Sequence, residues 1–429
     1  MKRILLFSHT TGYQLRAFND AAERLGIELM FATDRCHRLD DPWQDHAVPV
    51  RFHDLDTSLA AIMRAAEQRR VDGVVAVGDR PVVLAARAAE ALRIPWHSAA
   101  GAAASADKRR SRTAMAAAGL PSPRFVVVDV HSENPAPRFS TRGPRASDPG
   151  YPCVLKPLGL SGSRGVIRAD NDGEFVAAFD RIRHLLARPQ IRTARAGLED
   201  EILVEDYIDG DEFALEGLLT AGALRTFAIF DKPDPLSGPF FEETIYLTPS
   251  RLPAPVQVDV SHQVGRAASA LGLRHGPIHA ECRISRDGTI YVLEVAARPI
   301  GGLCSMVLTF DGGVPLEEVL LRHAIGDPIE GVARERAAAA VMMIPIPRSG
   351  LLKEVRGEGA ARRVPGVTDI RITAKRDQLL EQLPEAGSYL GFIFARAETA
   401  ADAERAVRDA HARLRFDIAR EIVVGRPRG

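Results

Sequence analysis

Continuous apolar runs alternate with amphipathic stretches along the first hundred residues. The runs at 4–7, 29–31 and 73–77 predict buried strands, and the stretches at 15–25 and 59–66 repeat apolar residues at helical spacing. Buried strands separated by amphipathic helices are typical of a parallel sheet with helices on both faces. We therefore expect an α/β domain at the start of the chain.

The pocket of such a domain is expected where its strands end. Ligands of parallel sheets bind beyond the carboxyl ends of the strands, which places 8–13 and 78–80 at a pocket rim. The first of these segments lacks G-x-G-x-x-G, which argues against a nicotinamide dinucleotide site. Tyr13 and the acidic stretch at 40–43 are further candidates for the entrance of the pocket.

The pattern changes after residue 104. A helix is expected over 107–118, and a Pro-, Ser- and Arg-rich stretch without a period predicts an exposed loop at 131–150. A β-rich region then runs to about residue 300. This region makes a second unit with both helix and sheet.

A small α+β module is expected after Gly326. Four apolar runs predict strands, at 341–346, 367–373, 389–395 and 422–424. A helix before the last of them repeats apolar residues at Ala403, Val407, Ala410 and Leu414. We therefore predict three domains, at 1–104, 105–326 and 327–429.

The composition of the 429 residues is that of an ordinary globular protein, with 46% hydrophobic and 26% charged residues. Lys+Arg and Asp+Glu both number 56, so no net charge favours nucleic acid or an anionic membrane as a partner. No apolar run approaches the roughly 20 residues of a membrane helix, and the apolar opening is too short for a signal peptide. Four cysteines without a CxxC pair predict reduced, buried thiols, so we expect a cytoplasmic protein.

The sequence around Asp287-Gly288 predicts a β-hairpin that brings two glutamates together. An Asp-Gly pair between two apolar runs is a strong signal for a two-residue turn. With that turn, Arg286 pairs with Thr289. Counting outward from this pair places Glu281 opposite Glu294 on one face, with Cβ atoms roughly 5 Å apart.

Two opposed carboxylates destabilise a sheet unless a cation lies between them. A hard divalent cation shared with nucleotide phosphates would resolve the conflict. The alternative is a solvated outer face on which both glutamates point into water, and a one-residue bulge would change the register. His279, opposite Ala296, and Arg298 are expected on the same face.

A second candidate site follows an apolar strand that ends at Lys156. The loop at 161–165 reads Ser-Gly-Ser-Arg-Gly, and its backbone N–H groups and hydroxyls suit a polyphosphate whose charge the lysine neutralises. No Gly-Lys-Ser/Thr opens a helix here, so this is not a P-loop. The alternative is an exposed turn beside a surface lysine.

A third candidate lies at 202–216, where a short acidic link and Gly210 join two strands. A link between two lobes can present backbone groups to the edge of an adenine. A carboxylate just beyond the link can accept hydrogen bonds from ribose hydroxyls. The alternative is a hairpin with acidic residues on its surface.

The order of these three segments resembles that of the ATP-grasp superfamily over residues 105 to about 305. The shared pattern is a first lysine, a strand lysine with a Ser/Gly loop, a hinge glutamate, and two metal-binding glutamates with an arginine four residues after the second. The resemblance implies a Rossmann-like substrate domain at 1–104, an ATP-grasp domain at 105–326 and a C-terminal α+β module at 327–429.

The resemblance also implies a role for each matching residue. The phosphates of ATP would be bound by Lys108 and Lys156, and the lid loop would contain Ser161, Gly162, Ser163 and Gly165. The adenine hinge would be formed by Glu205, Asp206, Tyr207 and Ile208, with Glu212 at the ribose. Mg²⁺, or Mn²⁺ as a substitute, would be held by Glu281 and Glu294, and Arg298 would stabilise the transferring phosphate.

Within the superfamily, the run from Glu294 to Gly302 and the module from 342 to 392 look like the L-amino acid ligase (dipeptide synthetase) branch. This likeness implies that an amide bond is formed between a carboxylate and an amine, through an acyl phosphate, with release of ADP and phosphate. Substrate contacts are then expected from His279, Lys232, Glu242, Gly301 and Gly302.

One position departs from the family pattern. Many members carry Asn two residues after the second glutamate, where this chain has Ala296, so a second magnesium would be held more loosely. The missing asparagine favours a rival function, a nucleotide-binding protein without turnover. A second rival is a carboxylase of the same fold that activates bicarbonate. His279 is a candidate base or a structural residue. Cys304 is interpreted as a packing residue. A homodimer is a candidate assembly.

Overall fold

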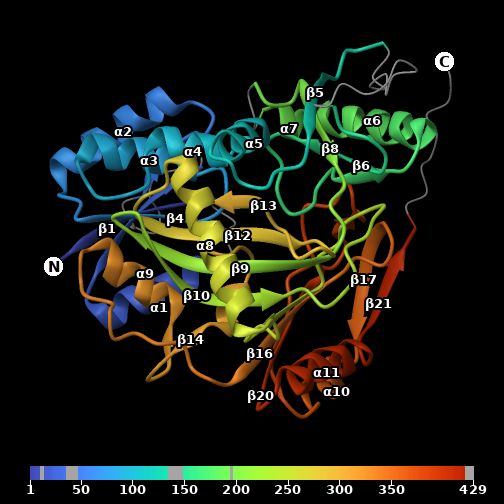
Figure 1. Ribbon diagram of the computed structural model, residues 1–429. Coiled ribbons are helices and arrows are strands. Elements are labelled where there is room, and N and C mark those ends of the chain that lie inside the picture. The colour runs from blue at the N-terminus through green and yellow to red at the C-terminus, as the bar shows by residue number, and fades with distance from the viewer. Residues whose placement is uncertain (10–13, 35–46, 134–147, 194–196, 421–429) are drawn as a thin grey trace, which may run out of the picture.

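A four-stranded parallel sheet begins the chain. The computed structural model describes residues 1–9, 14–34, 47–133, 148–193 and 197–420. The strands of the first sheet, in the order β3-β2-β1-β4, are β1 (Arg3–Ser8), β2 (Glu28–Thr33), β3 (Val48–Pro49) and β4 (Gly73–Ala76). One face is covered by α2 (Leu55–Gln68) and α3 (Val82–Leu92), and the other by α1 (Leu15–Leu25) (Figure 1). The predicted parallel sheet with helices on both faces is confirmed.

A second, smaller lobe follows α4 (Ala99–Ser105) and α5 (Lys108–Ala117). Its antiparallel sheet, in the order β5-β8-β6-β7, contains β5 (Phe125–Asp129), β6 (Cys153–Pro157), β7 (Ile167–Ala169) and β8 (Glu201–Asp206). One face packs against α6 (Asp172–Leu186), through Phe175 and Phe179, and α7 (Pro189–Arg192) follows that helix. The helix expected at 107–118 is confirmed, and the Asp107 carboxylate caps it by accepting from the backbone N–H groups of Arg109 and Arg110.

An eight-stranded antiparallel sheet forms the centre of the molecule. Its order is β13-β12-β9-β10-β11-β16-β20-β18. The strands are β9 (Asp211–Thr220), β10 (Ala223–Asp231), β11 (Ile245–Thr248), β12 (Gly276–Ile284), β13 (Ile290–Ala296), β16 (Ala338–Ile344), β18 (Val367–Ile372) and β20 (Gly391–Ala397). Helix α8 (Ala254–Leu271) crosses in front of β9, β10 and β12, and α11 (Ala400–His411) packs on β16 and β20 (Figure 1).

The remaining elements join these sheets. The 3₁₀ helix η1 (Cys304–Val307) and the strands β14 (Thr309–Phe310) and β15 (Val314–Pro315) lead into α9 (Leu316–Ala324), which packs against α1 and β4. A three-stranded sheet near the C-terminus contains β17 (Gly350–Arg356), β19 (Leu379–Leu380) and β21 (Arg415–Ala419). Helix α10 (Glu358–Arg362) lies between β17 and β18.

Several expectations need correction. The region interpreted as β-rich also contains α6 and α8, because their apolar spacing is helical. The C-terminal strands β16, β18 and β20 match three of the predicted runs, and they extend the central sheet. The predicted strand at 422–424 and most of the predicted loop at 131–150 lie outside the described residues. The three domain boundaries stay predictions.

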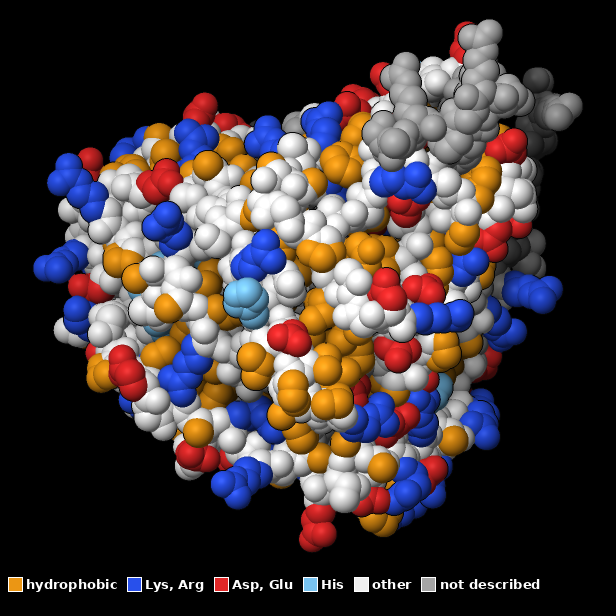
Figure 2. All heavy atoms as spheres, in the orientation of Figure 1, with side chains coloured by type: hydrophobic (Ala, Val, Ile, Leu, Met, Phe, Trp, Pro, Cys, Tyr) orange, Lys and Arg blue, Asp and Glu red, His pale blue; other side chains and the backbone are white. Residues whose placement is uncertain are grey.

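The charges on the viewed surface and the burial of the thiols agree with what the composition predicted. Figure 2 shows Lys/Arg and Asp/Glu side chains mixed across the viewed face, without a region of one sign. Among the described residues, no helix is long and apolar enough to cross a bilayer. Cys153, Cys282 and Cys304 are buried free thiols, and Cys36 lies outside the described residues.

Candidate active site

One cavity of about 270 Å³ is lined by the small-lobe sheet, the central sheet and the end of β4. It gathers most of the residues predicted to bind nucleotide, metal or substrate: Lys108, Lys156, Ser161, Gly162, Ser163, Glu205, Asp206, Tyr207, Ile208, Glu212, His279, Glu281, Glu294, Arg298, Gly301 and Gly302. Asp79, just after β4, also lines it, as expected for the end of that strand, whereas Ser8, His9, Gly78 and Arg80 of the expected rim do not. The predicted entrance residues Tyr13 and 40–43 lie outside the described residues.

The hairpin of β12 and β13 places Glu281 opposite Glu294, as predicted, but through a different turn. Ser285, not Arg286, pairs with Thr289, and the Ser285 N–H donates to the Thr289 carbonyl at 3.0 Å. The loop therefore has three residues and ends at Gly288, whose φ of 84° requires the left-handed region.

A bulge restores the predicted pairing of the glutamates. The register shifts by one residue between Glu281 and Cys282, which leaves Leu293 as the extra residue on β13. The predicted Arg286–Thr289 pair is wrong and the predicted Glu281–Glu294 pair is confirmed, because the longer turn and the bulge cancel each other.

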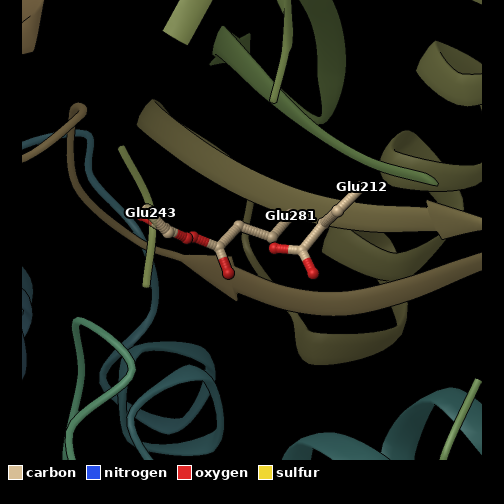
Figure 3. Close-up of side chains that lie close together, drawn as sticks. All are labelled: Glu212, Glu243 and Glu281. Carbon is tan, nitrogen blue, oxygen red and sulfur yellow. The ribbon is translucent and has the colours of Figure 1, made fainter. Parts of the chain in front are cut away.

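A lysine lies among three of the carboxylates. Figure 3 shows the side chains of Glu212, Glu243 and Glu281 pointing toward one another. The ammonium of Lys232, just after β10, lies 2.7 Å from Glu212, 2.5 Å from Glu243 and 3.4 Å from Glu281. Lys232 is therefore buried and ion-paired beside the cavity, in contact with residues that line it, while Glu242 is half-buried and does not line the cavity.

These charges shift the acidity of the carboxylates in opposite directions. Burial raises the pKa of Glu243 to about 8, and the neighbouring Glu281 adds to the shift. Burial also opposes ionisation of Glu281, but the Lys232 ammonium, together with His279 and a hydrogen bond with Glu243, lowers the pKa of Glu281 to about 2. Glu281 is thus an anion that faces the Lys232 ammonium.

The phosphate-binding candidate Lys156 is held by a buried triad. Its ammonium lies 2.5 Å from Glu205, which also pairs with Arg112 at 2.7 Å. The side chains of Arg112 and Glu205 are only 1% and 2% exposed, and together the two cations lower the pKa of Glu205 to about 2 in spite of its burial. Arg112 also donates to the carbonyl of the bulge residue Leu293 at 2.6 Å, so the triad connects the lysine to the glutamate hairpin.

The second lysine contacts the residue just before the lid loop. The Lys108 ammonium donates to the Leu160 carbonyl at 2.5 Å and lies 3.9 Å from Glu294. Gly162 and Gly165 have φ angles of 64° and 73°. A Cβ at Gly165 would lie 2.6 Å from the Pro157 side chain, so this position requires glycine. Gly165 itself does not line the cavity, unlike the predicted lid residues 161–163.

The arginine of the predicted metal strand pairs with the first domain. The Arg298 guanidinium donates to the Asp79 carboxylate at 2.7 Å and to the Pro299 carbonyl at 3.0 Å. Burial disfavours the charged form of Arg298, but Asp79, together with Glu294 and Glu216, raises its pKa. The residue is therefore a fixed cation in the cavity.

His279 faces a buried carboxylate. Its Nδ1 lies 3.1 Å from Glu216, which also accepts the N–H of Ile300 at 3.0 Å. Burial, with the nearby charge of Arg298, lowers the pKa of His279 to about 3. A histidine with this pKa stays neutral at pH 7 and is a weak proton acceptor, which favours the structural interpretation over that of a base.

An apolar end of the cavity was not predicted. Its walls come from β11, η1, β16, β20 and the segment before β20, through Tyr246, Cys304, Met343, Phe392 and Tyr389. Burial raises the pKa of the Cys304 thiol, which agrees with a packing role.

Charged residues of the site that were missed or left without a role include Asp79, Arg112, Glu216 and Arg283. Arg283 could have been predicted from the sequence. It lies two residues after Glu281 in the same strand, and residues two apart in a strand share a face. Glu216 lies opposite His279, and Glu212 opposite Arg283, in the pairing of β9 with β12. Arg112 lies one helical turn after Lys108, so spacing alone could have placed it on the same face of the helix.

Comparisons with known proteins show which families the chain resembles. Residues 19–96 match the family model of an ATP-grasp N-terminal domain, 149–307 that of an ATP-grasp domain, and 342–419 that of an L-amino acid ligase C-terminal domain 2. The crystal structure of an L-amino acid ligase from Bacillus licheniformis superposes with a TM-score of 0.81 and 26% identity, over 98% of this chain and 99% of that one.

Two curated ligases are similar over part of their length. A D-alanine–D-alanine ligase of Aromatoleum aromaticum is 30% identical over 215 residues, and an alanine–anticapsin ligase of Bacillus subtilis is 24% identical over 252 residues. The match covers 49% of this chain and 62% of the first relative, and 56% of this chain and 51% of the second.

Proposed function

Since the chain belongs to the ATP-grasp superfamily, as a ligase that forms carbon–nitrogen bonds, we propose that it activates a carboxylate with ATP and joins it to an amine. The acid is activated as an acyl phosphate, and ADP and phosphate are released. One observation carries the proposal: Lys108, Lys156 and Lys232 gather with Glu281 and Glu294 in or beside a single cavity. Such a concentration of charge suits a terminal phosphate, which is the group that must move.

The nucleotide is proposed to bind between the two lobes. Lys108 and Lys156 neutralise its phosphates, and residues 161–163 cover them. The backbone of 206–208 meets the adenine edge, because the Glu205 carboxylate is already engaged by Arg112 and Lys156. Glu212 is proposed at the ribose, where its oxygens also accept from Lys232 and Arg283.

The residues present fit a magnesium ion. Glu281 and Glu294 lie opposite each other with side chains 25% and 29% exposed, and their oxygens are the hard ligands that Mg²⁺ prefers. Mn²⁺ could take the same ligands. Ala296 offers no ligand, which agrees with looser binding of a second ion. When bound, the metal would neutralise the charge of the phosphates.

The chain's own groups would guide the chemistry. A carboxylate oxygen of the acid attacks the γ-phosphorus, and the bond to ADP breaks. Arg298 holds the carboxylate and the transferring group with its planar guanidinium. A neutral amine then attacks the acyl carbon and phosphate leaves. The loop at 161–163 excludes water, because hydrolysis of the intermediate would waste ATP.

Amino acids are the proposed substrates. The likeness to an L-amino acid ligase over 98% of the chain supports this class. The cavity combines Arg298, which suits an α-carboxylate, with an apolar end that suits a side chain. His279, Gly301 and Gly302 line the same cavity and remain proposed substrate contacts, whereas Glu242 lies outside its lining.

An ADP-release screen tests the proposal. Amino acids are supplied singly and in pairs with Mg²⁺ and ATP, and products are identified by mass spectrometry. ADP, phosphate and an amide are expected, and hydroxylamine added with the acid alone should trap a hydroxamate. AMP and pyrophosphate would overturn the acyl-phosphate route, and ADP formation with bicarbonate alone would support the carboxylase instead. ATP binding without ADP across the whole panel would support a protein without turnover.

A further inference from the structure

A short C-terminal segment contacts the lid loop of the distant small lobe. This segment, residues 381–387 between β19 and β20, is called the strap. The Gly165 N–H donates to the Pro384 carbonyl at 2.8 Å, and Arg164 Nε donates to the Glu385 carbonyl at 3.0 Å. Two consecutive lid residues are thus bonded to two consecutive strap residues.

Charged side chains reinforce this contact. Glu385 accepts two hydrogen bonds from Arg181 of α6, at 2.5 and 2.8 Å. Glu381 accepts from Arg188, just after α6, at 2.8 Å. Arg164 also lies within the field of both glutamates. The strap is acidic where the small lobe is basic, so the two surfaces are complementary.

The other side of the strap is fixed to the C-terminal strands. Ala386 is buried in the core beneath β16 and β20. The Gln382 side chain donates to the Pro347 carbonyl at 2.9 Å, and its backbone N–H donates to Ser349 at 3.0 Å. The strap therefore has a rigid base and reaches across to the lid. Tyr389, two residues beyond it, lines the apolar end of the cavity.

We propose that Glu385 and Glu381 are positioning residues for the lid loop. Through the strap, the C-terminal strands hold residues 161–165 over the cavity and set how well the reacting phosphate is shielded from water. The shielding part rests on the proposed function, whereas the holding part does not. The same segment leads into Tyr389, which lines the apolar end of the cavity. The strap would therefore position both this wall of the substrate pocket and the lid loop over the nucleotide.

Hydrogen exchange of the nucleotide-free protein tests the holding part. In Glu385→Gln, amides of 161–166 are expected to exchange about fivefold faster, and in the Glu381→Gln/Glu385→Gln double variant about tenfold faster. Asp377→Asn is the matched control, because it weakens a 2.7 Å ion pair with Lys353 in the same C-terminal region without touching the small lobe. Lid exchange equal to that of the control in both variants would overturn the proposal.

The ratio of ADP released to amide formed tests the shielding part. A loosened lid admits water to the acyl phosphate, so the ratio is expected to rise several-fold in Glu385→Gln while it stays near one in the wild type and in Asp377→Asn. A merely structural defect would lower ADP and amide in parallel and leave the ratio unchanged. Faster lid exchange with an unchanged ratio would overturn the shielding role, and the exchange result stands whether or not an amide is found.

Discussion

Arg298 and Asp79 are joined across two domains by a 2.7 Å charged hydrogen bond. Asp79 follows the last strand of the parallel sheet, and Arg298 follows the last strand of the hairpin that carries the paired glutamates. The first domain therefore orients the cation that is proposed to meet the substrate carboxylate.

Asp79→Asn should lower acid-dependent ADP release by roughly 10- to 100-fold, since a charge-assisted hydrogen bond contributes about 1.5–3 kcal/mol. The affinity for ATP should stay near that of the wild type, because Lys156 and its triad are intact. Initial rates over a range of acid concentrations, with ATP binding measured by calorimetry, separate the two effects. An equal loss of ATP affinity would contradict a role confined to Arg298.

Glu281→Gln and Glu294→Gln should each abolish ADP formation while the thermal midpoint changes little, because both carboxylates line the cavity and are the proposed metal ligands. Glu330→Gln, at an exposed glutamate, is the control. Rates are measured across a magnesium titration. Near-wild-type turnover of either variant at limiting magnesium would remove these glutamates from the metal site.

Lys156→Ala should weaken binding of ATP by about 10-fold or more but that of AMP much less, because the ammonium is proposed to meet phosphates and not the base. Glu205 keeps Arg112 as a partner at 2.7 Å, so the fold should survive the change. Binding of ATP, ADP and AMP by the same method gives the comparison. If all three lose affinity equally, the substitution has damaged the fold.

Stability should fall in mild acid because of a buried histidine. Burial lowers the pKa of His97 to about 4, whereas the unfolded chain protonates near its ordinary value of 6.5. Above pH 6.5, neutral His97 makes its full contribution to the free energy of unfolding. This contribution, on the order of 3 kcal/mol, is lost as the pH falls toward 4.

Urea unfolding at pH 7, 6 and 5 checks this prediction in the wild type and in His97→Gln. The variant should lose less free energy of unfolding between pH 7 and 5 than the wild type does. Gln can still donate to the Pro277 carbonyl, which His97 Nε2 contacts at 2.9 Å, so the fold should tolerate the change. Parallel pH profiles for the two proteins would exclude His97 as the source.

Local patterns in the sequence predicted much of the fold and of the site, and pairings between distant segments were the part that they could not predict. The lysines, the hinge and the paired glutamates each sit in a motif whose spacing is visible along the chain. The cross-strand partners Glu216 and His279 are 63 residues apart, and nothing local sets the register of β9 against β12. The same holds for Arg112, whose partner Glu205 is 93 residues away.

The hairpin shows how a correct pairing can follow from a wrong turn. The Asp287-Gly288 pair predicted two loop residues, but the turn uses three, with Gly288 in the left-handed region. The bulge adds Leu293, and the carbonyl of Leu293 accepts a hydrogen bond from Arg112. Arg112 lies on α5, far from the hairpin in the sequence. Turn propensities are local, whereas the bulge is stabilised by tertiary contacts.

The pairing of β11 with β16 limits how this chain can be divided or recombined. Strand β11 lies before the predicted boundary at 326/327 and β16 after it, and four residue pairs join them. A truncated chain that ends at residue 326 would leave β11 as an open edge, with unpaired N–H and C=O groups that favour aggregation. A chimaera that takes its C-terminal strands from a relative would need a donor strand with the same alternation of side chains as 338–344.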